Sequence, residues 1–285
     1  MPEFRQQKSG PSISSATVHV HHQKTVFFAA EWQDITPVAD AKLLTIMAHP
    51  QPRHKGDSLQ FWQLTVSGNS PGVGVIQINP GPRESGATAA ARKIRPQPAK
   101  LDVTIVKELL LPDANSDAGI MARVFLHETL TPAFVNRYDP QNDAAVMSYM
   151  RNVLENRRFR RFDLFGFKSS PSLLQLIHNK TQFAGLYTYP HIPAVQMVNV
   201  NTSLTIANSD TEPRQPQFAK HVENAISIAT RLIANPDPTE NGLYSWRTAG
   251  HEDPGGYLVK YATLGGITFY TLSADTPEPI HGAKW

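Results

Sequence analysis

The sequence predicts an α+β protein in which a β-rich domain precedes a mainly helical domain with a small β element. Apolar and polar residues alternate before residue 80, as they do in half-buried strands. Apolar residues recur at helical spacing after residue 117, and short β-rich segments return near the C-terminus. A chain of 285 residues, 40% hydrophobic and 18% charged, is long and apolar enough for one large domain or two ordinary ones.

The N-terminal part divides into a tail and a β-rich accessory domain. Residues 1–15 are rich in serine, glycine and proline, and we expect them to be flexible. Residues 16–98 form the accessory domain, and its predicted strands cover residues 16–21, 25–28, 61–66 and 72–78. A proline- and charge-rich connection over residues 79–100 places the domain boundary near residue 98.

Residues 99–285 form the second predicted domain. Its first helix carries an apolar stripe from Ile120 to Phe125, and Pro132 ends it. Further helical stripes cover residues 146–154, 173–177 and 218–233. Residues 257–260 and 267–272 have the composition of short strands around Gly265 and Gly266.

Composition narrows the classes of function. The chain has no cysteine, which excludes disulfides, zinc–thiolate sites and a thiol nucleophile. The net charge of +3 favours an anionic partner only weakly, and no basic run is long enough for a nucleic-acid arm. The densest basic patch, residues 157–161, fits a solvated helix end or a contact with an anionic substrate. No segment has the length of a membrane span or the apolar core of a signal peptide, so we expect synthesis in the cytoplasm without a leader.

Glu128 is the candidate catalytic residue. It follows Val124 by four positions, so it lies on the apolar stripe in the last turn of the first predicted helix. Partial removal from water disfavours a carboxylate anion there, and a carboxylic acid that keeps its proton can serve as a general acid. The alternative is a helix-end glutamate that faces solvent.

Other motifs carry less chemistry, and we expect neither a metal nor a cofactor. A zinc-protease helix needs a second histidine four positions after His127, where the chain has Thr131. His19, His21 and His22 alternate across a strand, and His251 lies in a turn. The Gly-x-Ser-x-Gly spelling at residues 68–72 leads into a strand rather than a helix, which is typical of a hairpin turn.

Four segments in the second half occur in the order found in one family. They are Ala122 to Glu128, the segment containing Gln182 and Phe183, residues 237–245, and residues 264–270. Together they resemble the spore cortex-lytic type of cell wall hydrolase. The resemblance implies a lysozyme-like fold for residues 99–285 and no cofactor. It places Glu128 at the family's first, catalytic glutamate.

The resemblance also implies the substrate and the reaction. The substrate would be peptidoglycan, with cleavage of the MurNAc–GlcNAc glycan strand by a lytic transglycosylase or a muramidase. The family's second glutamate is absent, which is compatible with the single-acid transglycosylase route; for hydrolysis, Asp139 or Asp143 could supply the base. The candidate substrate-binding residues are Gln182, Phe183, Tyr244 and Trp246. The alternative for Gln182 is a polar residue that caps a loop, and the alternative for the three aromatic residues is simple packing.

The alternatives from other classes are an N-acetylmuramoyl-L-alanine amidase and a non-catalytic cell-wall-binding protein. An enzyme of this kind without a leader fits an antibacterial toxin injected by a type VI-like secretion machine, or a phage lysin. The partners would then be peptidoglycan, a secretion-machine component and an immunity protein. The enzyme would act in the periplasm of a target cell.

Overall fold

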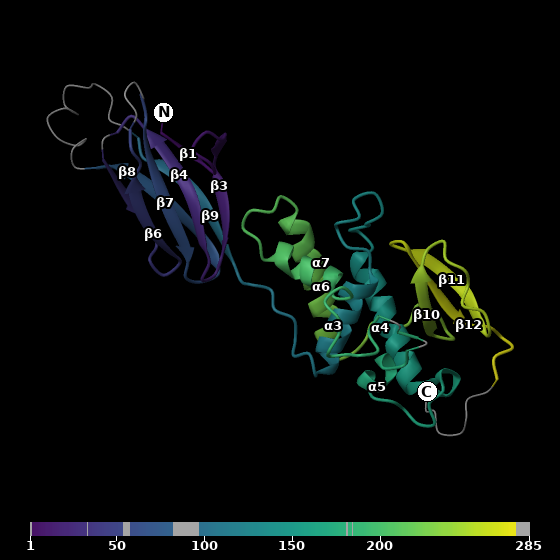
Figure 1. Cartoon of the computed structure of the whole chain (residues 1–285). Coiled ribbons are helices and arrows are strands. Elements are labelled where there is room, and N and C mark those ends of the chain that lie inside the picture. The colour runs from purple at the N-terminus through teal and green to yellow at the C-terminus, as the bar shows by residue number, and fades with distance from the viewer. Residues whose placement is uncertain are drawn as a thin grey trace. The chain divides into compact units, whose positions relative to one another are not determined.

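The structure is a computed structural model that describes residues 2–32, 34–53, 58–81, 97–180, 182–183 and 185–277. The chain divides into two compact units, Met1–Glu108 and Leu109–Trp285, which are described separately (Figure 1). In the described ranges, no helix is both long and apolar enough to cross a membrane.

In the first unit, the described residues form two sheets that share one apolar core. The five-stranded sheet has the order β2-β1-β4-β7-β6 and is antiparallel throughout. Its strands are β1 (Glu3–Arg5), β2 (Ser12–Ile13), β4 (Gln23–Ala30), β6 (Leu44–Pro50) and β7 (Gln60–Gly68). The four-stranded sheet has the order β3-β9-β8-β5, with β3 and β9 parallel. Its strands are β3 (Ser15–His19), β5 (Ile35–Val38), β8 (Gly72–Pro80) and β9 (Ala99–Val106).

The alternation of buried residues explains why these segments form strands. In β7 the side chains of Trp62, Leu64 and Val66 are buried, while their neighbours are less so. A period of two places alternate side chains on one face of a sheet, here the face toward the shared core. The expected flexible tail differs from the structure, since Phe4 in β1 is buried and pairs with Phe28 in β4.

Strand β9 also moves the boundary between the units. The sequence placed it near residue 98, but residues 99–106 lie between β3 and β8 in the sheet. Leu101, Val103 and Ile105 alternate with polar residues and enter the core of the first unit. The division therefore falls between Glu108 and Leu109.

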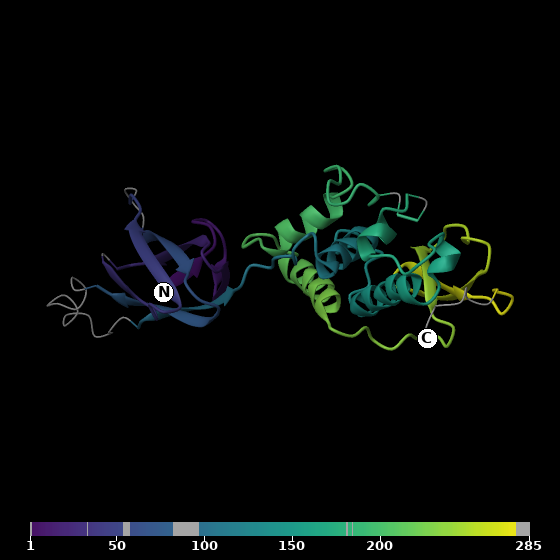
Figure 2. The same ribbon diagram turned by 90° about the horizontal axis from the view of Figure 1, so that it is seen from below.

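The described residues of the second unit form five α-helices and a three-stranded sheet. The helices are α3 (Asp117–Glu128), α4 (Asp143–Phe159), α5 (Leu173–Ile177), α6 (Val198–Ala207) and α7 (Gln215–Thr230), with a 3-10 turn η1 (Phe162–Phe165) after α4. The antiparallel sheet has the order β10-β12-β11 and contains β10 (Leu243–Thr248), β11 (Leu258–Leu264) and β12 (Ile267–Leu272). Figures 1 and 2 show this sheet beside α4, on the side away from α6 and α7.

The predicted fold class, α+β with a mainly helical lysozyme-like C-terminal domain, is wrong. The described part of the chain has twelve strands in three sheets against five α-helices, so sheets dominate the molecule. The sequence interpretation missed β1, β2, β5, β6, β9 and β10. Three of them, β1, β2 and β5, have four residues or fewer, and strands this short give little alternation by which to recognise them.

Two helices also differ from their predictions. Helix α6 lies in the polar segment before α7, where no helix was expected. Helix α7 ends at Thr230, and the apolar residues Leu232 and Ile233 beyond it are exposed rather than part of its buried stripe. Both differences come from tertiary packing, which decides whether a weak local pattern becomes a helix.

Candidate active site

Helix α3 positions Glu128. The Ser116 side chain caps the helix by accepting a hydrogen bond from the Gly119 amide, and Glu128 is the last helical residue. Ile120, Val124 and Phe125 are buried on the inner face of the helix and fix its rotation. The Glu128 side chain lies at the edge of this face and is 28% exposed, so its carboxyl group can reach a ligand.

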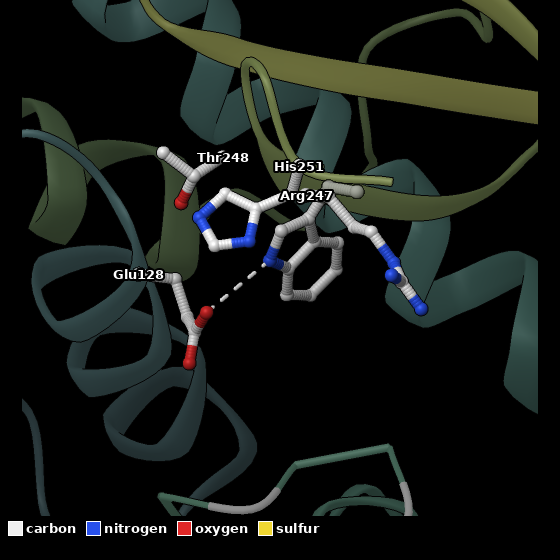
Figure 3. Close-up of a pocket in the computed structure, with 5 residues that line it drawn as sticks. Glu128, Arg247, Thr248 and His251 are labelled. Atoms are coloured by element: carbon white, nitrogen blue, oxygen red, sulfur yellow. Dashed lines mark hydrogen bonds between the residues drawn. The ribbon is translucent and has the colours of Figure 1, made fainter. Parts of the chain in front are cut away.

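Two side chains hold the Glu128 carboxyl group. The indole Nε1 of Trp246, on β10, donates to Glu128 Oε2 over 3.4 Å (Figure 3). His127 Nδ1 lies 2.9 Å from Glu128 Oε1. Trp246 is 118 positions away in the chain, so the site exists only when β10 packs beside α3.

Two adjoining pockets open around this carboxyl group, with volumes of about 270 and 240 Å³. Glu128, Trp246 and Arg247 line both of them. The first, the outer pocket, is completed by Thr248 and His251. The second, the inner pocket, is completed by Arg157, Phe165, Gln182, Phe183, Ser245, Pro254 and Leu258. Figure 3 shows His251 on the same side as Glu128, while the Arg247 guanidinium points away from it.

Glu128 is the one carboxylate among the described residues that line the two pockets. The two aspartates considered as a catalytic base lie elsewhere. Asp143 is buried, where it accepts hydrogen bonds from His221 Nδ1 and Asn224 Nδ2, both at 2.8 Å. Asp139 accepts from the side chain and backbone of Asn142. Both aspartates therefore stabilise the structure around the start of α4 through hydrogen bonds.

Gln182, Phe183 and Trp246 lie together with Glu128. The Phe183 and Trp246 rings are 5.8 Å apart at 60°, and both line the inner pocket. The Gln182 amide is already engaged, since its Oε1 accepts from Arg157 and its Nε2 donates to the Phe165 carbonyl. Gln182 therefore orients Arg157 in addition to facing the pocket.

Tyr244, the remaining predicted site residue, does not line either pocket. It occupies a bulge in β10, where the pairing with β12 shifts between Leu243 and Ser245. Its side chain is 0% exposed and stacks on Phe165 at 6.3 Å. Burial raises the pKa of the Tyr244 hydroxyl to about 12. Tyr244 contributes to the site through its backbone carbonyl, which accepts a hydrogen bond from Arg157.

Arg157 is a site residue that the sequence indicated only as part of the basic patch at residues 157–161, which fitted a solvated helix end or a contact with an anionic substrate. It extends from α4 into the inner pocket, with its guanidinium 4.5 Å from the centre of the Phe165 ring. Burial lowers the pKa of Arg157 to about 9, so the side chain remains protonated at neutral pH. The sequence does not distinguish it from the other basic residues of the run, because such a run is usually a solvated helix end.

The outer pocket adds Arg247, Thr248 and His251, none of which was predicted as a catalytic or substrate-binding residue. Arg247 and Thr248 could have been found from the sequence, because they directly follow the predicted site residue Trp246. His251 had no such signal, since it lies in a turn after β10.

A catalytic zinc site uses three protein ligands. The described lining of both pockets offers two side chains of suitable type, Glu128 and His251.

Comparisons with known proteins assign no family. No family model and no curated protein matches the chain. Among solved structures, the S-layer protein SbsC domains 4 and 5 align at 15% identity with a TM-score of 0.23, over 33% of this chain and 42% of that one. Amebosin aligns at 15% identity with a TM-score of 0.24, over 32% of this chain and 88% of that one. Such low scores carry no argument about fold, and the resemblance to cortex-lytic hydrolases stays a prediction.

Proposed function

We propose that residues 109–285 cleave the MurNAc–GlcNAc glycan strand of peptidoglycan, with Glu128 as the general acid and base. The observation that carries the proposal is the Glu128 carboxyl group, half-buried at the end of α3 and facing two adjoining pockets. His127 and Trp246 each contact one of its two oxygens and so fix its position, and a positioned side chain is what general acid–base catalysis requires.

The absence of a second carboxylate from the described pocket lining favours the transglycosylase route over hydrolysis. A glycosidase ordinarily uses two carboxyl groups, one as the acid and one as the base or nucleophile. In the transglycosylase route, the Glu128 carboxylic acid gives its proton to the bridging oxygen as the C1–O bond of muramic acid breaks. The carboxylate then takes the proton of the muramic acid 6-hydroxyl, whose oxygen bonds to C1 and forms the 1,6-anhydro ring.

The inner pocket supplies surfaces of the kind that bind sugars. Phe165, Phe183 and Trp246 line it with aromatic carbon, and the Ser245 and Gln182 side chains add polar groups. Ligand sites usually combine apolar walls with a few fixed polar groups. A sugar ring on Trp246 would lie beside Glu128, since the indole donates to that carboxyl group.

The test is digestion of purified peptidoglycan by the wild-type protein, by Glu128→Gln and by Glu223→Gln, followed by mass spectrometry. Glu223 is an exposed glutamate on α7 outside both pockets, so it matches the chemical change without touching the site. We expect anhydro-muropeptides from the wild type and from Glu223→Gln, and none from Glu128→Gln. Circular dichroism spectra establish that all three proteins are folded.

The other outcomes separate the alternatives. Reducing-end products one water heavier would identify a muramidase. Free stem peptides would identify an amidase and overturn the proposal. A folded wild-type protein that releases no product would overturn it in favour of a wall-binding function, and full activity in Glu128→Gln would overturn the assignment of the acid.

A further inference from the structure

Arg157 is a buried cation without a carboxylate partner. It is 6% exposed, and the ion pairs of the described residues include none to its guanidinium. Three other arginines on or next to α4 differ in this respect, because each of them forms a salt bridge. These pairs are Arg151 with Glu155, Arg158 with Asp117, and Arg161 with Asp163. Arg157 faces the inner pocket, and its charge is left uncompensated although the side chain is buried.

The contacts of Arg157 hold the guanidinium in place without neutralising it. Its Nε donates to the Tyr244 carbonyl over 2.6 Å and its Nη1 to Gln182 Oε1 over 3.1 Å. Both acceptors are neutral, and a guanidinium carries more N–H donors than these two. The remaining nitrogen, Nη2, makes no hydrogen bond within the described residues. It is also not one of the fully buried atoms without a partner, so it is open to the pocket. Nη2 therefore retains donors for a ligand.

The surroundings of Arg157 favour an anion in the inner pocket. The Phe165, Phe183 and Trp246 rings lie 4.5, 5.6 and 5.9 Å from the guanidinium carbon and soften the cost of its burial. They carry no net charge, and desolvation still lowers the pKa of Arg157. Arg247 also lines the pocket. It donates to the Glu252 carbonyl and forms no salt bridge with a carboxylate of the described residues.

We propose that Arg157, assisted by Arg247, binds a carboxylate of the substrate in the inner pocket, beside the acid Glu128. This inference rests on the proposed glycan-strand cleavage and names the substrate more closely. A planar guanidinium matches a carboxylate through paired N–H bonds and is suited to buried sites. On peptidoglycan such a group is the lactyl carboxylate of muramic acid where the stem peptide has been removed, or a carboxylate of the stem peptide itself.

The test compares three ligands by isothermal titration calorimetry with the full-length wild-type protein. The first is the disaccharide GlcNAc–MurNAc, which has a free lactyl carboxylate and lacks the MurNAc–GlcNAc bond. The second is its methyl ester, which is neutral, and the third carries L-Ala-D-isoGln on the lactyl group. We expect the ester to bind roughly tenfold more weakly than the acid. The stronger binder of the first and third ligands identifies the source of the carboxylate.

Substitutions test whether the two arginines cause the preference for the acid over its methyl ester. Arg157→Gln and Arg247→Gln should each reduce the ratio between acid and ester, while Arg157→Lys, which keeps the charge, should retain part of it. Arg231→Gln is the control, because Arg231 is exposed and does not line either pocket. If Arg157→Gln does not fold, the wild-type comparison and Arg247→Gln still decide the question.

The outcomes for binding and for cleavage are separate. Equal binding of acid and ester, or binding of neither, would overturn the carboxylate subsite even if the wild type cleaves peptidoglycan. An undiminished preference in folded Arg157→Gln would overturn the role of Arg157. A preference that depends on Arg157 in a protein that releases no anhydro-muropeptides would uphold the subsite and overturn the proposed reaction.

Discussion

At the scale of single residues, Trp246 combines two roles that one substitution can separate. Its ring lines both pockets, and its Nε1 donates to Glu128. We expect Trp246→Phe to lower kcat roughly tenfold and to change KM little, because it removes the donor and keeps an aromatic face. Rates on soluble glycan fragments measure both constants.

Trp246→Ala provides the comparison, because it removes the donor and the ring together. We expect that variant to lose both kcat and affinity. Equal kcat in Trp246→Phe and the wild type would show that the indole N–H does not act on Glu128.

The residues of the site were predictable to different degrees, for a physical reason. Glu128 could be recognised because helical spacing is a local property of the sequence. Arg157 could be recognised only as one member of a basic patch, because its environment is set by the Tyr244 carbonyl, 87 positions further along the chain. Tyr244 was expected to face a substrate, but the bulge in β10 leaves its side chain inside the protein. Contacts of this kind are not encoded in any short segment.

At the scale of elements, the start of α3 depends on a close backbone approach at Gly119. A Cβ atom there would lie 1.8 Å from the Asp113 carbonyl oxygen and 2.9 Å from that of Pro112. Helix propensity alone predicts that Gly119→Ala stabilises the protein by about 1 kcal/mol. We expect the reverse, a loss of about 1–3 kcal/mol or more, because the backbone has to move to accept the methyl group.

Urea unfolding measures the change in unfolding free energy. The control is Ala118→Gly at the neighbouring position, which measures the difference in helix propensity between alanine and glycine in the same helix. That control should lose about 1 kcal/mol, since it changes only the intrinsic preference. An increase in unfolding free energy for Gly119→Ala would contradict the approach of residues 112–113 to α3. Because α3 carries Glu128, a displaced helix should also reduce activity.

Strand β9 shows why one part of the fold was missed. Its alternation of Leu101, Val103 and Ile105 with polar residues is as regular as that of β7, so the local signal was present. The proline-rich stretch before it has the composition of a linker between domains, so the sequence predicts that the first domain ends before β9. The pairing of β9 with β3 and β8 is a long-range property that no short segment reveals.

At the scale of the whole molecule, the two units have separate cores and the site belongs to one of them. Every described residue that lines the two pockets lies between residues 128 and 258. Leu109 belongs to the same unit, because its backbone exchanges two hydrogen bonds with the Asn208 side chain, at 2.8 and 3.0 Å. We therefore expect a fragment of residues 107–285 to fold and to keep whatever peptidoglycan-cleaving activity the full chain has. Loss of that activity in a folded fragment would show that the first unit contributes to the reaction.

The first unit gives the sharper test of the boundary, because two fragments that differ by ten residues should behave in opposite ways. Residues 1–108 contain both sheets, and we expect them to unfold in one cooperative thermal transition. Residues 1–98 lack β9, which lies between β3 and β8 and supplies Leu101, Val103 and Ile105 to the core. Without it, β3 loses its partner in the sheet and the facing sheet loses part of its apolar cover. Circular dichroism melts compare the two, and a cooperative transition in residues 1–98 would show that β9 is dispensable for this fold.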